Sequence, residues 1–575
     1  MFYIAFTNQS FPRHDAADYL SVSDKILIET RQMGWSTFPE NLYHIRNWKP
    51  IILPSITAVF SVLTGGELLV GAKIQNLFFL ALSLLYFFRL SRLLTGNTQK
   101  SLLVASTVIM FSGALDLLCV YTAEIVQLTC SAGFMAHYFS KEKSTADYWL
   151  AIFWVCLGLM ARPAEILMFI FVIVVFEMCK SFKESPLQTL WATFSFLIFA
   201  AGLHRAAAEN LANSSLMLGS CVAALVLLCF KKRMNFFLHL YVTAQITASL
   251  WYWSYFNQVY GWVWTSSIGV AAKLTGQRGD MSAISFVLRI FRIIGSAEFS
   301  VLIFTCILLF CTALGRTIFV KKNKLDISLS SQDFLIFFSL CTPILIGTFG
   351  ANADLRYYIT IVLLFTVFIY SKLIKNLESS ASVQKFILIG SFTGLFAWQL
   401  FHFYRFDQTK STAYIYGPYY KFSRYSTSPD PIRQFADQLS ENKELKEFIR
   451  PRINTVNWNC GSDISQTTDT WPLRILLHEK GLDWSVDRVL IFNFKTREER
   501  LNVLKHDADF VVAGPIDNCR ATYDNSNPVS ELTEYLVTAF KNNTIQQTGF
   551  EFLGLIPGSG RDGSTGQFLL LKTLR

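Results

Sequence analysis

Charged residues are scarce in this chain. Asp, Glu, Lys and Arg make up 16% of its 575 residues, 52% are hydrophobic, and the mean hydropathy is +0.36. Soluble domains usually carry about 25% charged residues, so the composition excludes an ordinary water-soluble protein. The aromatic content of 15% fits a bilayer protein, in which aromatic side chains fill helix interfaces and collect at the membrane surfaces.

Patterns that define several common protein classes are also missing. No Cys and His spacing resembles a zinc site. The glycine-rich stretch 554–566 joins two strand-like runs and opens no helix, so nucleotide-driven chemistry has no support. The formal net charge of +10 does not indicate nucleic-acid binding, because Lys and Arg occur in short clusters between apolar runs.

Long apolar runs fill most of the first 400 residues. A helix needs ~20 residues to cross the ~30 Å hydrocarbon core of a bilayer. Runs of about that size cover residues 69–90, 102–118, 121–139, 148–160, 166–178, 187–203, 216–230, 236–255, 299–314, 334–349, 357–370 and 386–400. We therefore expect an α-helical polytopic membrane protein with about 11 to 13 transmembrane helices.

Alternation of these runs sorts the basic residues onto one side. The connections that we predict to be cytoplasmic contain Arg89, Arg92, Lys100, Lys141, Lys143, Lys180, Lys183, Lys231, Lys232, Arg233, Arg316, Lys321, Lys322, Lys324, Lys372 and Lys375. The outer set then holds the N-terminal segment, the turn at 161–163, the long loop 256–298, the turn at 352–356 and everything after 401. We expect a multi-pass protein of the bacterial inner (plasma) membrane with its C-terminal domain on the periplasmic or extracellular side.

Three parts follow from these patterns. Residues 1–47 contain no spanning run and form an outer N-terminal loop segment with an acidic motif, and residues 48–403 form the transmembrane domain. The stretch 48–63 is apolar but interrupted by Pro50 and Pro54, which predicts a helix lying in or dipping into the outer interface. Residues 404–575 turn polar and charged and form a soluble domain.

The soluble domain shows signals for both helices and strands. Helices are predicted at 431–449 after Asp430 and at 471–480, and Thr496 with Glu499 forms a capping box that opens a helix to His506. Strands are predicted at 489–494, 510–513, 551–555 and 567–572, which indicates an α+β or α/β domain containing a βαβ unit. Its two cysteines, Cys460 and Cys519, either form a disulfide, as an oxidising periplasm would allow, or remain free thiols.

Polar residues at the expected helix ends are the candidates for chemistry. Asp15 and Asp18 could form an acid/base site near the membrane surface; alternatively, Asp18 caps a helix running through Thr30 and Asp15 is simply solvated. Arg162 could bind a phosphate or reach lipid head groups. Lys49 could hold a substrate or anchor the chain at the interface, and Glu124 is an intramembrane acid, a type of residue that often has a function.

Four short motifs follow one another along the chain in an order that can be compared with known families. They are Asp15 with Tyr19, Lys49-Pro50 before an apolar helix, Leu159-Met160-Ala161-Arg162-Pro163 between helices, and Arg356-Tyr357 at the start of a late helix. In this order, and on one face of the membrane, the motifs resemble the GT-C superfamily of membrane glycosyltransferases. The branch they resemble contains the protein O-mannosyltransferases and the lipid A aminoarabinose transferases.

The resemblance implies transfer of a sugar, with inversion, from a polyprenyl-phosphate donor to a lipid, glycan or protein acceptor at the outer surface. Asp15 occupies the position of the family's general base, but Ala16 stands where members commonly have Glu, so the assignment stays between Asp15 and Asp18. Arg356 is the first candidate for the phosphate clamp. Tyr357, Arg162, Lys49 and Glu124 are further candidates for substrate or phosphate binding.

Other expectations stay open at this point. No cofactor is certain, and a requirement for a divalent metal ion is left open. The family has a first transmembrane helix ahead of the acidic loop; either this chain begins after that helix or lacks it. Polysaccharide ligases and polymerases on similar frames are a related subclass. A transporter or flippase of a lipid-linked glycan, and a membrane anchor for a binding domain, are the alternatives from other classes. We see no internal repeat of the kind many transporters contain.

Overall fold

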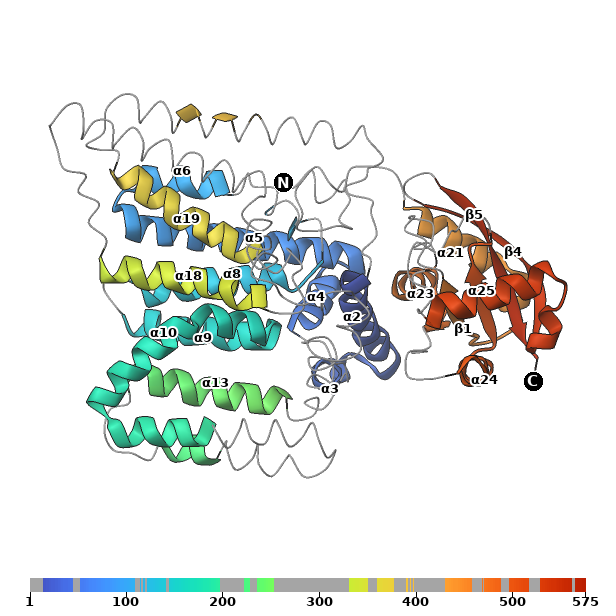
Figure 1. Ribbon diagram of the computed structural model, residues 1–575, viewed down its shortest axis with the longest axis horizontal. Helices are drawn as coiled ribbons and strands as arrows, with labels where there is room; N and C mark the ends of the chain where they lie inside the picture. The colour runs from blue at the N-terminus through green and yellow to red at the C-terminus, as the bar shows by residue number, and fades with distance from the viewer. Residues whose placement is uncertain are drawn as a thin grey trace.

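The computed structural model consists of a helical bundle followed by a smaller domain built on a β-sheet (Figure 1). The residues that it describes are 14–44, 52–108, 114, 117–118, 121–140, 144–196, 222–227, 235–252, 330–349, 359–376, 389–390, 393–394, 397, 430–457, 468, 470–487, 496–516, 528–560 and 564–574.

The bundle is built around a few long helices. The described elements are α2 (His14–Met33), η1 (Trp35–Thr37), α3 (Phe38–His44), α4 (Ile52–Leu63), α5 (Leu68–Thr95), α6 (Thr98–Val108), α8 (Glu124–Tyr138), α9 (Thr145–Ala161), α10 (Pro163–Glu184), α13 (Phe236–Tyr252), α18 (Ser331–Phe349) and α19 (Ile359–Asn376). Helix α5 packs against α4, α6, α8 and α19, and α9 packs against α8, α10 and α13.

Helix α8 forms the interior of the bundle. Every residue from Glu124 to Tyr138 is buried, although the helix contains many small and polar side chains. A glycine lets its neighbour approach closely: a Cβ atom added at Gly133 would lie 2.6 Å from the indole nitrogen of Trp154 in α9. Close packing of helices through small residues is typical of membrane bundles.

The apolar helices differ in length from the expected runs. Among the described residues, α5 is the one helix that is long and apolar enough to cross a membrane by itself. Shorter apolar helices cover Ile52–Leu63, Thr145–Ala161, Phe236–Ala248 and Ile359–Lys372. Of the expected spans, 299–314 lies outside the described residues, as do most of 216–230 and most of 386–400. The stretch 48–63, expected at the interface, contains α4, whose Leu53, Thr57 and Ser61 are buried against the bundle.

The expected N-terminal loop segment contains a 20-residue helix, α2. Asp15 and Asp18 both lie within it, so the alternative in which Asp18 caps this helix is wrong. Asp18 is 4% exposed, so it is not a solvated surface acid. The helix lies on the side of the bundle that faces the C-terminal domain (Figure 1), and it contacts α4, α5 and, across the domain boundary, α23.

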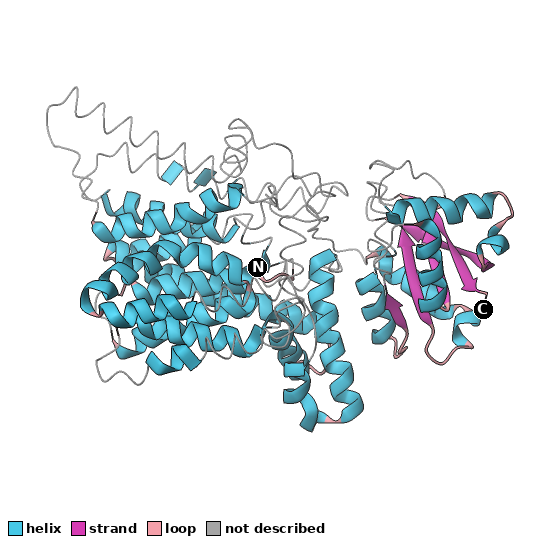
Figure 2. Cartoon of the chain, turned by 60° about the horizontal axis from the view of Figure 1, so that its bottom comes forward, coloured by secondary structure: helices cyan, strands magenta, loops and turns pink. Residues whose placement is uncertain are grey.

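The C-terminal domain contains a five-stranded mixed sheet with helices on both faces (Figure 2). Its elements are α21 (Pro431–Glu441), α22 (Lys443–Lys446), β1 (Arg452–Asn457), α23 (Thr470–Glu479), β2 (Ser485–Asp487), α24 (Arg497–Asp507), β3 (Phe510–Gly514), α25 (Pro528–Lys541), η7 (Ile545–Thr548), β4 (Phe550–Ser559) and β5 (Thr565–Thr573). The strand order is β2-β1-β3-β5-β4; β1 is parallel to β2 and β3, and β4 and β5 form an antiparallel hairpin beside β3.

Alternate residues of β1 point into separate cores. Ile453 belongs to the apolar cluster that contains Leu473 of α23, whereas Val456 packs with Leu504 of α24 and Leu536 of α25. A parallel strand buried on both faces is expected where helices cover both sides of a sheet. The α/β alternative for the soluble domain thus describes its parallel half, and the terminal hairpin adds an antiparallel edge.

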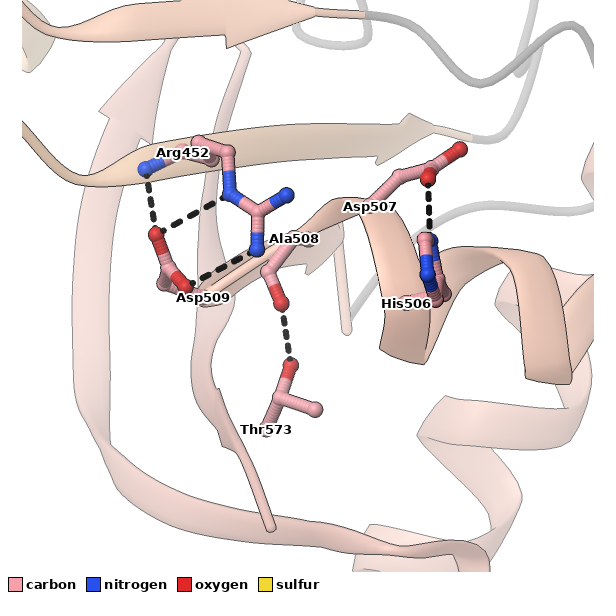
Figure 3. Close-up of polar contacts among 6 residues, drawn as sticks. All are labelled: Arg452, His506, Asp507, Ala508, Asp509 and Thr573. Atoms are coloured by element: carbon pink, nitrogen blue, oxygen red, sulfur yellow. Dashed lines mark hydrogen bonds and ion pairs between the residues drawn. The ribbon is translucent and has the colours of Figure 1, made fainter. Parts of the chain in front are cut away.

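Asp509 joins the starts of β1 and β3 (Figure 3). Its carboxylate accepts hydrogen bonds from the backbone N–H of Arg452 at 2.9 Å and from the guanidinium at 3.3 and 3.4 Å. The hydroxyl of Thr573, at the end of β5, donates to the carbonyl of Ala508 at 2.9 Å. These contacts set the register of β1, β3 and β5, the three central strands, at one end of those strands.

Candidate active site

An ion pair stands at the end of the bundle where α8 begins. Glu124, the first residue of α8, binds the guanidinium of Arg162 through its Oε1 atom. The carboxylate side chain is 3% exposed and the arginine side chain is 21% exposed. The sequence singled out both residues separately; the structure brings them together across 38 residues.

The position of Arg162 follows from the residue after it. Pro163 occupies the first turn of α10, where a missing N–H costs nothing, and a residue before proline avoids helical geometry. Arg162 accordingly has φ −161° and ψ 84°, and its N–H bonds the carbonyl of Gly158 at 2.7 Å. Gly158 allows the two helices to meet closely, since an added Cβ would lie 2.9 Å from a side-chain atom of Ile166. The guanidinium is thus held at a sharp break between α9 and α10.

Helix α19 begins at the same place. The hydroxyl of Thr360, the second residue of α19, lies 3.5 Å from the backbone carbonyl of Glu124 and donates to it. Residues near the starts of α8 and α19 and the end of α9 therefore share one end of the bundle.

A buried polar network extends this end toward α2. The Tyr121 hydroxyl, three residues before Glu124, lies 3.3 Å from Ser23 Oγ in α2 and also contacts Thr57 Oγ1 in α4. Thr57 donates to Gln75 Oε1 in α5 at 2.5 Å, and Ser23 donates to the carbonyl of Pro54 at 3.0 Å. The network ties the acid-bearing helix α2 to the segment that leads into Glu124. Our sequence reasoning missed it, because single Ser, Thr and Tyr residues in apolar runs give no signal of their own.

Only some of the remaining predicted site residues lie within the part of the chain that the structure describes. Asp18 and Tyr19 are buried in α2, and the helix also contains Asp15, whose side chain the structure does not describe. Lys49, Arg356 and Tyr357 lie outside the described residues.

The opposite end of the bundle carries a second polar cluster, on the other ends of the same helices. Asp147 at the start of α9 binds His137 Nδ1 at 2.7 Å, accepts from Ser144 Oγ at 3.0 Å and forms an ion pair with Arg89 of α5. Nearby in the fold, Lys372 of α19 binds Asp333 of α18 at 2.5 Å. Each of these charged groups has an opposite partner, so we assign the cluster to holding the helices together.

The described part of the chain contains no cluster of metal-binding side chains. There, no three His, Cys, Asp or Glu side chains come together in a group that could hold a metal ion.

Comparison with known proteins places the chain near two solved structures. One is an oligosaccharyltransferase from Archaeoglobus fulgidus in complex with Zn and sulfate, 12% identical over 97% of this chain and 69% of that chain, with a TM-score of 0.41. The other is ArnT from Cupriavidus metallidurans in the apo state, 10% identical over 99% of this chain and 96% of that chain, with a TM-score of 0.38.

Similarity at this level transfers neither an activity nor a residue correspondence to this chain. No protein-family model matches the sequence, and no curated protein matches it.

Proposed function

We propose that this protein is a membrane glycosyltransferase that moves a sugar from a polyprenyl-phosphate donor to an acceptor at the outer face of the membrane. The observation that carries the proposal is the Tyr121–Ser23 contact. It fastens α2, which contains Asp15 and Asp18, to the end of the bundle where Arg162 and Glu124 meet. An acidic helix beside a guanidinium at one end of a helical bundle supports the proposal, because such a transfer needs a base and cations near the departing phosphate.

The chemistry is a direct displacement. An acceptor hydroxyl attacks the anomeric carbon, and its proton passes to the carboxylate of Asp15 or Asp18. The bond between the anomeric carbon and the phosphate oxygen breaks, and its electron pair stays on that oxygen. Attack opposite the leaving group inverts the anomeric configuration. Negative charge grows on the departing phosphate, so fixed cations near it lower the barrier.

The cations divide into two kinds in this proposal. Arg356, four residues before Thr360 in the sequence, is the first candidate to bind two phosphate oxygens, with Tyr357 and Lys49 as further donor contacts. Arg162 is already bound by Glu124, so its charge is largely balanced before any substrate arrives. We therefore assign Glu124 to orienting Arg162, and Arg162 to the edge of the phosphate site.

The membrane orientation is part of the same proposal. The polar cluster that contains Arg89 and Lys372 would face the cytoplasm, in line with the basic loops, and the Arg162 end would face outward. The C-terminal domain contacts α2 and would therefore lie outside, next to the reaction.

The test is transfer by the purified full-length protein. It is incubated with labelled polyprenyl-phosphate sugars and membrane lipid extracts, and product is followed for wild type, Asp15→Asn and Asp18→Asn. Loss of the general base should lower the rate by about 10²- to 10⁴-fold. The base is the residue whose substitution produces that loss; equal rates for all three proteins would remove both acids from the mechanism.

A second measurement separates transfer from transport. Liposomes containing the protein and a labelled polyprenyl-linked sugar are assayed for movement of the label between leaflets without acceptor. Transfer without movement supports the glycosyltransferase, whereas acid-independent movement without transfer would favour the flippase alternative. In both assays Asp507→Asn is the matched control for the Asp15→Asn and Asp18→Asn variants, because the Asp507 carboxylate is 54% exposed and lies in the C-terminal domain.

A further inference from the structure

Helix α2 is held from two sides by adjacent residues. Ser23 bonds the carbonyl of Pro54 in α4 and faces the Tyr121 hydroxyl, whereas Asp24 contacts His478 in α23 of the C-terminal domain. Asp24 and His478 are separated by 454 residues in the chain. The acid-bearing helix thus lies between the bundle and the domain (Figure 1).

The Asp24–His478 contact is short and largely closed to water. Asp24 Oδ2 lies 2.6 Å from His478 Nδ1, and the two side chains are 12% and 13% exposed. Apolar packing surrounds it, because one continuous cluster of buried side chains includes Leu20 and Leu27 of α2 and Leu473 and Leu477 of α23. A shielded hydrogen bond to a carboxylate is stronger than its exposed counterpart.

Further charged groups lie near the pair. Glu479, next to His478 in α23, lies 3.5 Å from Arg433 of α21. Asp24 of α2 and Glu67, just before α5, both act on the Glu479 carboxylate. The contact region therefore contains the carboxylates of Asp24, Glu67 and Glu479, and His478 is the group that bonds the Asp24 carboxylate of α2.

We propose that His478 is a positioning residue, through which the C-terminal domain holds α2 so that its acidic half keeps its place beside the candidate active site. The inference rests on the proposed function. Asp18 precedes Asp24 by six residues, ~9 Å along the helix at ~1.5 Å per residue. A rigid helix transmits a shift at one end to the other, and a displacement of ~1 Å at a reacting group can cost ~10²-fold in rate.

The experiment compares His478→Ala, His478→Asn and His506→Ala in the full-length protein. Asparagine places a side-chain nitrogen close to the position of Nδ1, so it can still donate to Asp24. His506 is the matched control, because it lies in the same domain, is 88% exposed and contacts Asp507. Two readouts are taken: hydrogen exchange of α2 amides by mass spectrometry, and kcat with KM for the polyprenyl-phosphate sugar.

His478→Ala should raise exchange in α2 at least several-fold and lower kcat by about 10- to 100-fold, while KM stays within about twofold. His478→Asn should restore most of both values, and His506→Ala should match wild type. Asp24→Ala should reproduce the His478→Ala effects, and the double variant should add little, because both remove the same contact.

Two results would overturn the inference. Unchanged exchange in α2 would show that His478 does not hold the helix, and raised exchange with unchanged kcat would show that holding it does not matter for the reaction. If the wild type transfers no sugar, the proposed function fails. The exchange measurement would still decide whether the domain holds α2.

Discussion

Glu479 of α23 lies 3.5 Å from the guanidinium of Arg433 in α21, yet its pKa is raised above the ordinary value of 4.5. Burial is the largest cause, and the carboxylates of Asp24 and Glu67 add to it, whereas Arg433 acts in the opposite direction. Docking of the domain on α2 therefore contributes to the raised pKa of Glu479, through the carboxylate of Asp24.

The expected pH dependence follows from that sign. A raised pKa means that the folded, docked state holds its proton more tightly than the unfolded state, so the stabilising contribution is complete below about pH 4.5 and declines as pH rises through the raised pKa. Hydrogen exchange of α2 amides, corrected for the intrinsic pH effect, should increase across that window. Glu479→Gln should flatten the increase. An unchanged slope in this variant would contradict the assignment of the pH effect to Glu479.

Breaking the Arg162–Glu124 pair on one side should be costly. Removing one partner of a buried ion pair leaves the other charge uncompensated, at about 3–5 kcal/mol, and Glu124 is 3% exposed. Arg162→Met should lower the thermal unfolding midpoint in detergent, whereas Arg162→Met combined with Glu124→Leu should recover most of the loss. If the double variant unfolded earlier than the single one, the pair would not be the source of the loss.

Asp509 and Asp507 offer a matched comparison in the C-terminal domain (Figure 3). Asp509→Ala removes the acceptor for the Arg452 backbone N–H and should cost about 1–3 kcal/mol. Asp507→Ala, in an exposed pair with His506, should change stability by no more than about 0.5 kcal/mol. Hydrogen exchange of the β1 and β3 amides in the full-length protein measures both. Equal protection in the two variants would contradict the role given to Asp509.

The two alternatives for Cys460 and Cys519, a disulfide or two free thiols, can be tested directly. Both cysteines lie outside the described residues, but the strands that precede them in the sequence end side by side: Asn457 of β1 is the register partner of Gly514 of β3. Protein purified from an oxidising compartment should give a peptide pair joined by a disulfide in non-reducing mass spectrometry. Two alkylated thiols in protein trapped before lysis would support the free-thiol alternative.

Local signals predicted the helix starts well. Asp430 accepts from the N–H of Ile432 at the start of α21, and Thr496 with Glu499 forms the capping box of α24. Such caps involve residues two or three apart, so they can be read without knowing the fold. The expected helix 431–449 breaks at Asn442, whose side chain caps a second short helix by accepting from Leu445 N–H. The strand at 510–513 is confirmed as β3, whereas that expected at 489–494 lies outside the described residues.

Strand β1 and helix α25 were not predicted from the sequence. In β1, Asn454 and Thr455 are 2% and 3% exposed between apolar neighbours, so no alternation of polar and apolar residues marks a strand. Burial of Thr455 depends on Thr470, whose hydroxyl lies 2.8 Å away after 15 residues of chain. A polar residue that finds its partner only in the folded domain gives a misleading local pattern.

Long-range pairing limited the prediction of the site in the same way. The sequence marked Arg162 because Pro163 follows it and Glu124 because it interrupts an apolar run, but nothing local says that they meet. The Asp24–His478 contact has no sequence signal at all, since it joins the N-terminal helix to a domain that begins some 400 residues later. Helix ends could be predicted from the sequence, whereas which ends meet depends on packing.

The Asp147 cluster has a mechanical consequence for the bundle. Sliding α5 along α9 would separate Arg89 from Asp147, and sliding α18 along α19 would separate Lys372 from Asp333, each leaving a poorly hydrated charge behind. The helices are thus pinned at the end remote from α2. The end where Glu124 and Thr360 lie is held as well, by the Arg162–Glu124 ion pair and by the hydrogen bond from Thr360 to the Glu124 carbonyl, so polar contacts join the helices at both ends of the bundle.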